Sequence, residues 1–240
     1  MQIDPRTVAR NIPGIFDEIF PQLTPGIVMH FNMQAEAMPI RPLPKQLLDA
    51  STLQHAMLFE LAYSVAENLL RDEPIDWSVC FEATLERQRA YFDAKLPEQL
   101  DAPDMEVAEL VGRNLVDSLR QMSSNRGLPL LIRPSIPGFE WIASGKGDFS
   151  IGDCLIEVKS TAKRFSSSDY RQVAIYWLLS YAAAIEGRGT EWTDFVLFNP
   201  RNGTTVRLDF DKFLSVISSG RTKIDILQLF QSLVGSRLTR

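Results

Sequence analysis

One short stretch, from Asp148 to Lys159 with the sequence DFSIGDCLIEVK, constrains the fold of this chain more than any other. Two apolar runs flank a Gly-Asp pair, which is the pattern of two antiparallel strands joined by a two-residue turn. Such a turn pairs position 151 with 154 and position 150 with 155, so that Asp148 lies opposite Glu157. Opposed side chains lie roughly 4.5 to 5.5 Å apart at Cβ, where like charges are destabilising. The hairpin therefore predicts a positive charge, most simply a divalent cation, between the two carboxylates.

The second strand of this hairpin has two different faces. Because side chains alternate along a strand, Glu157 and Lys159 share one face, while Cys154, Ile156 and Val158 point to the other. The second face is apolar enough to belong to a core. The sequence thus predicts a lysine that stands beside the carboxylate pair.

The charge of the chain is unevenly distributed. The net charge is −5, but residues 1–100 hold 8 Lys and Arg against 14 Asp and Glu, whereas residues 101–240 hold 17 against 16. The densest basic cluster surrounds the hairpin, where it is placed to meet phosphates, although such a cluster is also typical of an ordinary solvated surface. Its members are Arg126, Arg133, Lys146, Lys159, Lys163, Arg164 and Arg171.

Composition predicts a soluble cytoplasmic protein. The hydrophobic content of 45% in 240 residues is ample for a packed core, in one large domain or two small ones. The two cysteines are Cys80 and Cys154, and the second falls in the predicted core strand, which argues against a disulfide scaffold. The first 20 residues lack a basic start followed by an apolar run, and no apolar stretch approaches the length of a membrane span.

The first hundred residues predict a mostly helical region. Prolines interrupt residues 1–44, so we expect no long regular elements there. Apolar residues recur every four positions within 45–70 and predict one helix, and a second helical segment follows at about 76–95. The segment 97–104, PEQLDAPD, is the best candidate for a domain boundary. We therefore expect an N-terminal region over residues 1–100, serving as a docking surface for a partner or substrate, and a second domain over 101–240.

The second domain predicts an alternation of helices and strands around the hairpin. No proline occurs between positions 143 and 199, as expected for central strands covered by a helix. The predicted order begins with a helix at 105–122, one or two strands over 129–137 and 139–143, and the hairpin. A helix at 169–185, strands at 192–198 and 204–208 around an Asn-Gly turn, and short helices at 210–217 and 224–234 follow.

This order, with an acid on one strand and Glu-x-Lys on the next, resembles the PD-(D/E)xK nuclease superfamily. The signature residues would be Asp148, Glu157 and Lys159, and the following helix carries Gln172 and Tyr176 in QVAIY, which is similar to the Q-x-x-x-Y element of the RecB-type branch. The resemblance covers roughly residues 105–199. It implies an α/β class, more closely an α+β mixed sheet flanked by helices with a restriction-endonuclease-like core.

Three details of the sequence bear on this resemblance. Glu109, on the helix before the sheet, matches a position where many members carry an additional acid. A second Asp-x-Lys copy, Asp93-Ala94-Lys95, lies in a polar stretch with no facing acid, which shows that the short string alone carries little information. Gly147, and not the proline of the family's motif, precedes Asp148, but that proline is often absent from members and does no chemistry.

The resemblance implies a Mg²⁺ or Mn²⁺ site that hydrolyses phosphodiesters. Asp148 and Glu157 would hold the ion, with the Val158 carbonyl and Glu109 as further ligands. Lys159 would orient the attacking water and stabilise developing charge. Gln172 and Tyr176, four residues apart on one helix face, would position substrate or water.

Each of these residues also has a purely structural interpretation. Asp148 would be a turn residue, Lys159 a salt-bridge partner of either acid, Gln172 a member of a capping box with Asp169, Tyr176 a core residue, and Glu109 the partner of Arg113 in an i,i+4 pair.

Other chemistries lack the residues that they require. His30 and His55 are the two histidines and neither has a nearby cysteine pair, so zinc ligands are missing, and the chain has no phosphate-binding G-x-x-x-x-G-K-[ST] loop. The leading hypothesis is a Mg²⁺-dependent DNA endonuclease of a bacterial restriction or anti-phage defence system, acting with other subunits or as a homodimer. The alternatives are a catalytically inactive module that binds nucleic acid or a partner protein, and a DNA repair or recombination nuclease.

Overall fold

The computed structural model describes residues 2–89 and 96–235, so the second Asp-x-Lys copy, Asp93 to Lys95, lies outside the described residues. The described chain forms two compact units. The first joins the residues up to 36 with residues 128–198 and those from 205 onward, and the second comprises residues 37–127 and 199–204.

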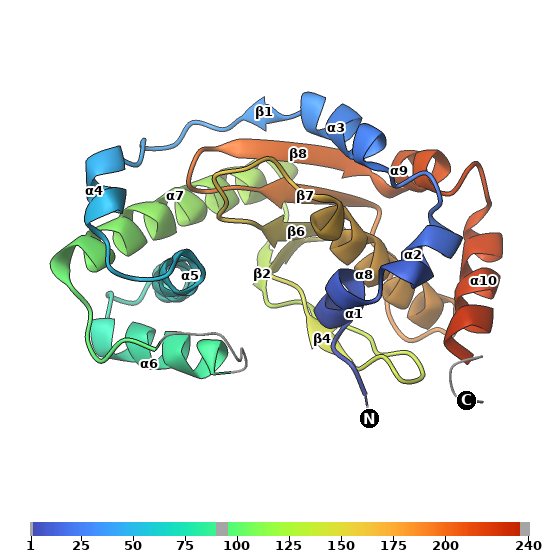
Figure 1. Cartoon of the computed structure of the whole chain (residues 1–240), viewed down its shortest axis with the longest axis horizontal. Coiled ribbons are helices and arrows are strands. Elements are labelled where there is room, and N and C mark those ends of the chain that lie inside the picture. Colours follow the sequence, from blue (N-terminus) through green and yellow to red (C-terminus); the bar gives the residue numbers. More distant parts are fainter. Residues whose placement is uncertain (1, 90–95, 236–240) are drawn as a thin grey trace. The chain divides into compact units, whose positions relative to one another are not determined.

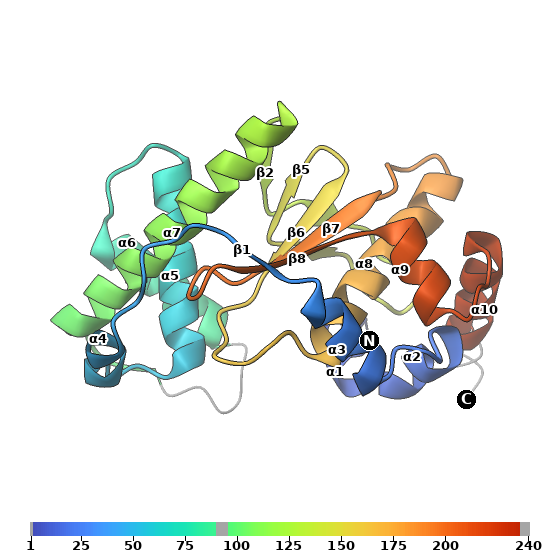
Figure 2. The same ribbon diagram turned by 90° about the horizontal axis from the view of Figure 1, so that it is seen from above.

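A mixed six-stranded sheet is the centre of the first unit, which confirms the predicted class of a mixed sheet flanked by helices (Figure 1). Strands β6 and β7 are parallel, whereas β2 and β5, β5 and β6, and β7 and β8 pair antiparallel. In spatial order the strands are β1 (Glu36–Ala37), β8 (Thr204–Asp209), β7 (Asp194–Phe198), β6 (Cys154–Val158), β5 (Phe149–Ile151) and β2 (Leu130–Ile132) (Figure 2). A separate antiparallel pair is formed by β3 (Ser135–Ile136) and β4 (Gly145–Lys146).

The register of the β5–β6 hairpin is the predicted one. Ile151 pairs with Cys154 and Phe149 with Ile156, so that Asp148, one step beyond β5, lies opposite Glu157. Gly152 has a φ of +61°, a value that a glycine adopts without strain at the first central position of a tight hairpin turn. The turn chemistry in the sequence therefore determined which residues face each other.

Helix α8 (Ser167–Ile185) connects the parallel strands β6 and β7, a pairing that requires a crossover. Residues from Tyr170 to Ala183 are buried except Arg171, so α8 is a core helix and not an amphipathic surface helix. Helices α9 (Phe210–Ile217) and α10 (Lys223–Gly235) follow the sheet, at the predicted positions. Aromatic rings of Phe195, Phe210 and Phe213 pack together in this core.

The proline-rich N-terminal segment contains three short helices, and each begins with a proline. These are α1 (Pro5–Asn11), α2 (Pro13–Ile19) and α3 (Pro25–Met33). Proline is tolerated at the first helical position, where its missing N–H has no intrahelical partner and its fixed φ already suits a helix. The prolines that forbid long elements therefore start short ones, and α1 packs against α8.

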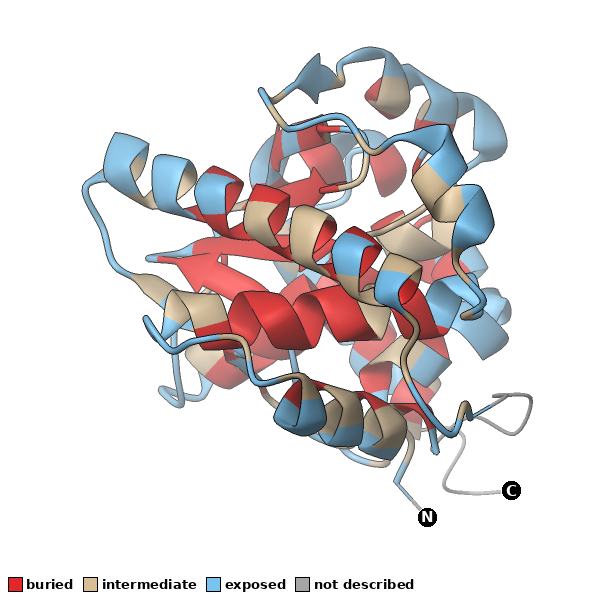
Figure 3. Ribbon diagram, turned by 90° about the vertical axis from the view of Figure 1, so that its left-hand side faces the viewer, coloured by how far each residue is buried: buried red, intermediate tan, exposed pale blue. Residues whose placement is uncertain are grey.

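The second unit is helical and consists of α4 (Lys45–Ala50), α5 (His55–Leu70), α6 (Trp77–Gln88) and α7 (Ala102–Arg126). Helix α5 packs against both α6 and α7 and is buried along most of its length (Figure 3). The single helix predicted over 45–70 is wrong, because the chain leaves the helix between residues 51 and 54. Ser51 and Thr52 instead donate hydrogen bonds to the buried carboxylate of Asp104.

The division into units does not coincide with the predicted boundary near residue 100. Asp101 and Asp104, in the predicted linker, form the capping box of α7 and tie this helix to the loop after α4. Residues 2–36, in contrast, belong to the unit that contains the sheet. The strand predicted at 139–143 is also absent, since Phe139 and Ile142 form only an isolated bridge around a turn. Within residues 2–89 and 96–235, no helix combines the length and the apolar character needed to cross a lipid bilayer.

Candidate functional site

The structure brings five of the predicted site residues together on one side of the first unit's sheet. Asp148 directly precedes β5, Glu157 lies on β6, and Lys159 follows β6. Gln172 and Tyr176 lie on α8, one helical turn apart. Hydrogen bonds connect the side chains of Glu157, Lys159, Gln172 and Tyr176, and the backbone N–H of Asp148 joins this network at Glu157.

Each of the two carboxylates accepts a hydrogen bond from a backbone N–H on the opposite side of the hairpin. The N–H of Asp148 donates to Glu157 Oε1 at 3.1 Å, and the N–H of Val158 donates to Asp148 Oδ2 at 2.9 Å. The Glu157 side chain has no exposed surface, and that of Asp148 is 12% exposed. Hairpin pairing thus fixes both carboxylates in one buried position, as the register predicts.

Lys159 and Gln172 complete a bonded ring with Glu157. Lys159 Nζ donates to Gln172 Oε1 at 2.9 Å and lies 3.5 Å from Glu157 Oε2, and Gln172 Nε2 donates to the same Glu157 oxygen at 2.5 Å. The Gln172 amide group therefore links the lysine to the carboxylate and fixes the position of both.

The structure decides two of the structural alternatives. The capping box of α8 is formed by Ser166 and Asp169, so Gln172 has no capping role. Tyr176 is a core residue, with 1% of its surface exposed, but its hydroxyl accepts a hydrogen bond from Gln172 at 3.2 Å. Tyr176 is thus part of the core and of the site at once.

Arg6, on α1, is a site residue that the sequence did not reveal. Its Nη2 donates to Asp148 Oδ1 at 2.7 Å and to the Lys146 carbonyl at 3.3 Å, and its Nε donates to the Tyr176 hydroxyl at 2.8 Å. The side chain is 35% exposed. The positive charge expected near the carboxylates is thus supplied in part by the chain itself.

Burial dominates the electrostatics of the site. Burial, followed by the charge of Asp148, raises the pKa of Glu157 from 4.5 to about 7, although Lys159 and Arg6 oppose this rise. Burial and the charge of Glu157 also raise the pKa of Tyr176 far above its ordinary value. Burial by itself lowers the pKa of Arg6, but the charge of Asp148 and the neighbouring Tyr176 and Glu157 outweigh it and raise that pKa. Arg6 is therefore a permanent cation.

Glu109 lies on α7, in the second unit. Its carboxylate is bonded to Arg113 at 2.8 Å, and both side chains are about 40% exposed. The i,i+4 ion pair that the helical spacing predicts is therefore present. A metal-binding role for Glu109, and likewise for the Val158 carbonyl, stays a prediction.

The residues present fit a hard divalent cation. Two carboxylates offer four oxygens, the type of ligand atom that a hard cation prefers. Mg²⁺ is commonly held by one or two carboxylates together with water and substrate phosphate. No cluster of three or more His, Cys, Asp or Glu side chains occurs among residues 2–89 and 96–235, so the carboxylate pair would need ligands from water and substrate.

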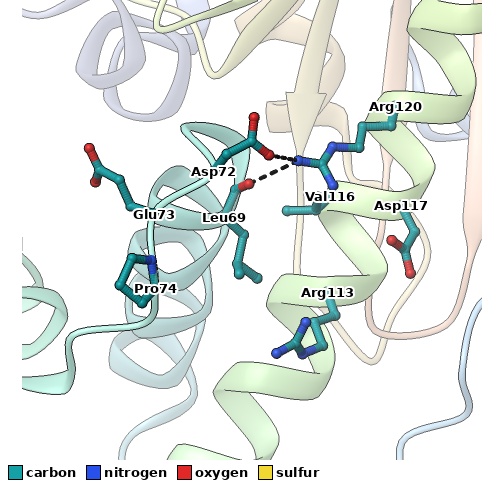
Figure 4. A pocket seen from close by; sticks show the side chains of 8 residues that line it. All are labelled: Leu69, Asp72, Glu73, Pro74, Arg113, Val116, Asp117 and Arg120. Carbon is teal, nitrogen blue, oxygen red and sulfur yellow. Dashed lines mark hydrogen bonds and ion pairs between the residues drawn. The ribbon is translucent and has the colours of Figure 1, made fainter.

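A hollow lies in the helical unit, between the α5–α6 connection and α7 (Figure 4). Arg120 spans it, donating to Asp72 Oδ1 at 2.7 Å and to the Leu69 carbonyl at 3.0 Å. Both partners of this ion pair are more than half exposed, and further acidic and basic residues line the hollow. An exposed ion pair of this kind is typical of an ordinary protein surface.

Comparisons with known proteins add no family assignment, because neither a family model nor a curated protein sequence matches this chain.

Proposed function

We propose that this protein is a metal-dependent phosphodiesterase acting on DNA, with Mg²⁺ or Mn²⁺ held by Asp148 and Glu157. The observation that carries the proposal is the buried carboxylate pair with Lys159 held beside it by Gln172. Proteins rarely bury two facing acids for structural reasons alone, because desolvation and mutual repulsion both make such an arrangement costly. Functional sites retain such arrangements since they need the resulting electrostatic properties.

Each side chain has a defined role in this proposal. A bound Mg²⁺ would lower the pKa of an attached water and neutralise charge on the leaving oxygen. Asp148 and Glu157 hold the ion, and Lys159 orients the attacking water and stabilises charge on the phosphoryl oxygens. Gln172 fixes the positions of the Lys159 and Glu157 side chains relative to each other, because it bonds both of them. Tyr176 accepts a hydrogen bond from the Gln172 amide group one helical turn further on.

Several exposed basic residues lie close to the site residues along the sequence, and they support the proposal of a polyanionic substrate. The backbone N–H of Arg133 donates to the Asp148 carbonyl at 2.9 Å, and Lys146 precedes Asp148 by two positions. Lys163 and Arg164 lie on the loop that leads from Lys159 to α8. These four side chains are exposed, so their charges are available to phosphates. A setting in restriction or anti-phage defence, with further subunits or a second copy of the chain, is part of the same proposal.

The proposal is tested by incubating the protein with supercoiled plasmid, linear duplex, single-stranded DNA and RNA in Mg²⁺, Mn²⁺ or EDTA. We expect cleavage of DNA only with the metal, and its loss in D148N and K159A. The matched control is K212A, which removes an exposed lysine on α9 of the same unit and should cleave normally. Cleavage by D148N and K159A at the wild-type rate would refute the assigned site.

One observation favours a second function, that of a non-cleaving module that binds nucleic acid or a partner. Arg6 already places a positive charge on Asp148, so the carboxylates are stabilised without an added cation. A protein that binds DNA in EDTA as well as in Mg²⁺, and that cleaves none of the four substrates, would establish this alternative.

A further inference from the structure

Arg6 is held in place by the local structure of α1. Asp4 caps this helix, since its Oδ1 accepts the backbone N–H of Arg6 at 2.8 Å, and Pro5 occupies the first helical position. Val8 and Ala9, on the same helix, have no exposed surface. The guanidinium is therefore directed to the carboxylates by a packed helix.

The backbone of Ile3, which precedes α1, anchors this helix further. The N–H of Ile3 donates to the Trp141 carbonyl at 2.9 Å, and the N–H of Ala143 donates to the Ile3 carbonyl at 2.9 Å. These two bonds tie the chain before α1 to the turn that leads into β4. Arg6 is consequently an integral part of the site.

The contacts of Arg6 overlap with those that a cation would make. A divalent cation bound by both acids requires an oxygen of Asp148, and Oδ2 is already directed at the Val158 N–H. The other oxygen, Oδ1, accepts from Arg6 Nη2. Two positive charges on one carboxylate oxygen repel each other, so occupancy of Oδ1 by Arg6 opposes occupancy by a cation.

We propose that Arg6 is an internal competitor of the divalent cation. In the metal-free protein its guanidinium is paired with Asp148, and it must leave Asp148 before the cation binds. This inference rests on the proposed function in that it assumes a cation at Asp148 and Glu157. The contact of Arg6 Nε with the Tyr176 hydroxyl does not involve Asp148, so the side chain can leave the carboxylate without leaving the site.

The experiment measures cation affinity in the absence of DNA, because a guanidinium at this site can also bind substrate phosphate and would confuse an activity readout. Mn²⁺ is titrated calorimetrically into the wild type, R6Q, R6K and R10Q. Arg10 is an exposed arginine on the same helix and serves as the matched control. D148N and the double variant R6Q with D148N identify binding at the carboxylate pair.

We expect R6Q to bind Mn²⁺ about tenfold more tightly than the wild type or more, since a hydrogen bond between charged groups is lost from the competing state. R6K should fall between them, because one ammonium group cannot bond Asp148 and Tyr176 through separate nitrogens as the guanidinium does. R10Q should match the wild type, and D148N should abolish binding in both backgrounds. A residue that only supported the fold would leave the affinity unchanged or weaken it.

Three results would overturn the inference. Equal affinities of R6Q and the wild type, at a site abolished by D148N, refute competition and leave the proposed metal site intact. No binding by any variant refutes the metal site itself and the inference with it. If circular dichroism shows that R6Q does not fold, R6K decides, and an R6K affinity equal to that of the wild type refutes the competition.

Discussion

The ionisation of Glu157 provides the sharpest test of the site's electrostatics. The perturbation is a change of pH from 5 to 8.5 in EDTA, which removes any bound metal. Glu157 has no exposed surface, and burial and the charge of Asp148 raise its pKa from 4.5 to about 7. We therefore expect the metal-free protein to contain a carboxyl group that titrates near neutrality.

The size of the effect on stability follows from the difference between the pKa of Glu157 in the folded protein and its value in the unfolded chain. The folded protein binds the Glu157 proton more tightly than the unfolded chain, so the contribution to stability is fully present below pH 4.5 and is lost as the pH rises through 7. A rise from 4.5 to about 7 corresponds to roughly 3 kcal/mol at about 1.4 kcal/mol per pH unit. The folded state should thus be less stable at pH 8.5 than at pH 5 by an amount of this order.

Two measurements check this expectation. Carbon-13 NMR of protein labelled at the glutamate carboxyl carbon should show one signal with a midpoint near pH 7, and this signal should be missing in E157Q. Urea unfolding should show a free-energy difference between the wild type and E157Q that changes by roughly 3 kcal/mol across the pH range, because the contributions of most other groups cancel. Two results would show that burial does not raise the pKa of Glu157. The signal that E157Q lacks could titrate near pH 4.5, or the difference in unfolding free energy between the wild type and E157Q could stay constant with pH.

Three further predictions concern the elements that build the two units. Gly152→Ala should cost roughly 1 to 3 kcal/mol of stability, because its φ is +61° and an added Cβ would lie 2.7 Å from Leu128 Cδ1, and urea unfolding would measure this. Gly112→Ala should destabilise the α5–α7 contact by a similar 1 to 3 kcal/mol, since the new Cβ would lie 2.9 Å from the Ala62 carbonyl oxygen; thermal unfolding no lower than that of the wild type would contradict this. Asp104→Ala should cost roughly 2 to 4 kcal/mol by leaving several partly buried donors without this acceptor, and hydrogen exchange should then increase at the start of α7.

The hairpin and the flanking helices could be predicted because their signals are local. A two-residue turn with glycine fixes a register from the sequence alone, and this places Asp148 opposite Glu157 before any tertiary contact is considered. Gln172 and Tyr176 could be placed on one helix face for the same reason, since a separation of four residues needs only the helix itself.

The features that the sequence did not reveal depend on contacts between distant segments. Arg6 is 142 residues from Asp148, and no periodicity indicates where its side chain points. The Asp4-Pro5 pair is a helix-start signal that predicts α1, but not its partner. The break at residues 51–54 has the same origin, because the apolar recurrence predicts a continuous helix and the buried carboxylate of Asp104 interrupts it.

Arg6 also changes the inference that is drawn from the facing acids. Repulsion between Asp148 and Glu157 was the sequence argument for a metal, but with both acids ionised their charge of −2 is balanced by Arg6 and Lys159. A divalent cation added to this balanced group would give it a charge of +2 and would be opposed by Arg6 and Lys159. A DNA phosphate carries negative charge and reduces this excess. The proposed site is therefore expected to bind the cation weakly by itself and more strongly together with DNA, a coupling that removal of Arg6 should reduce.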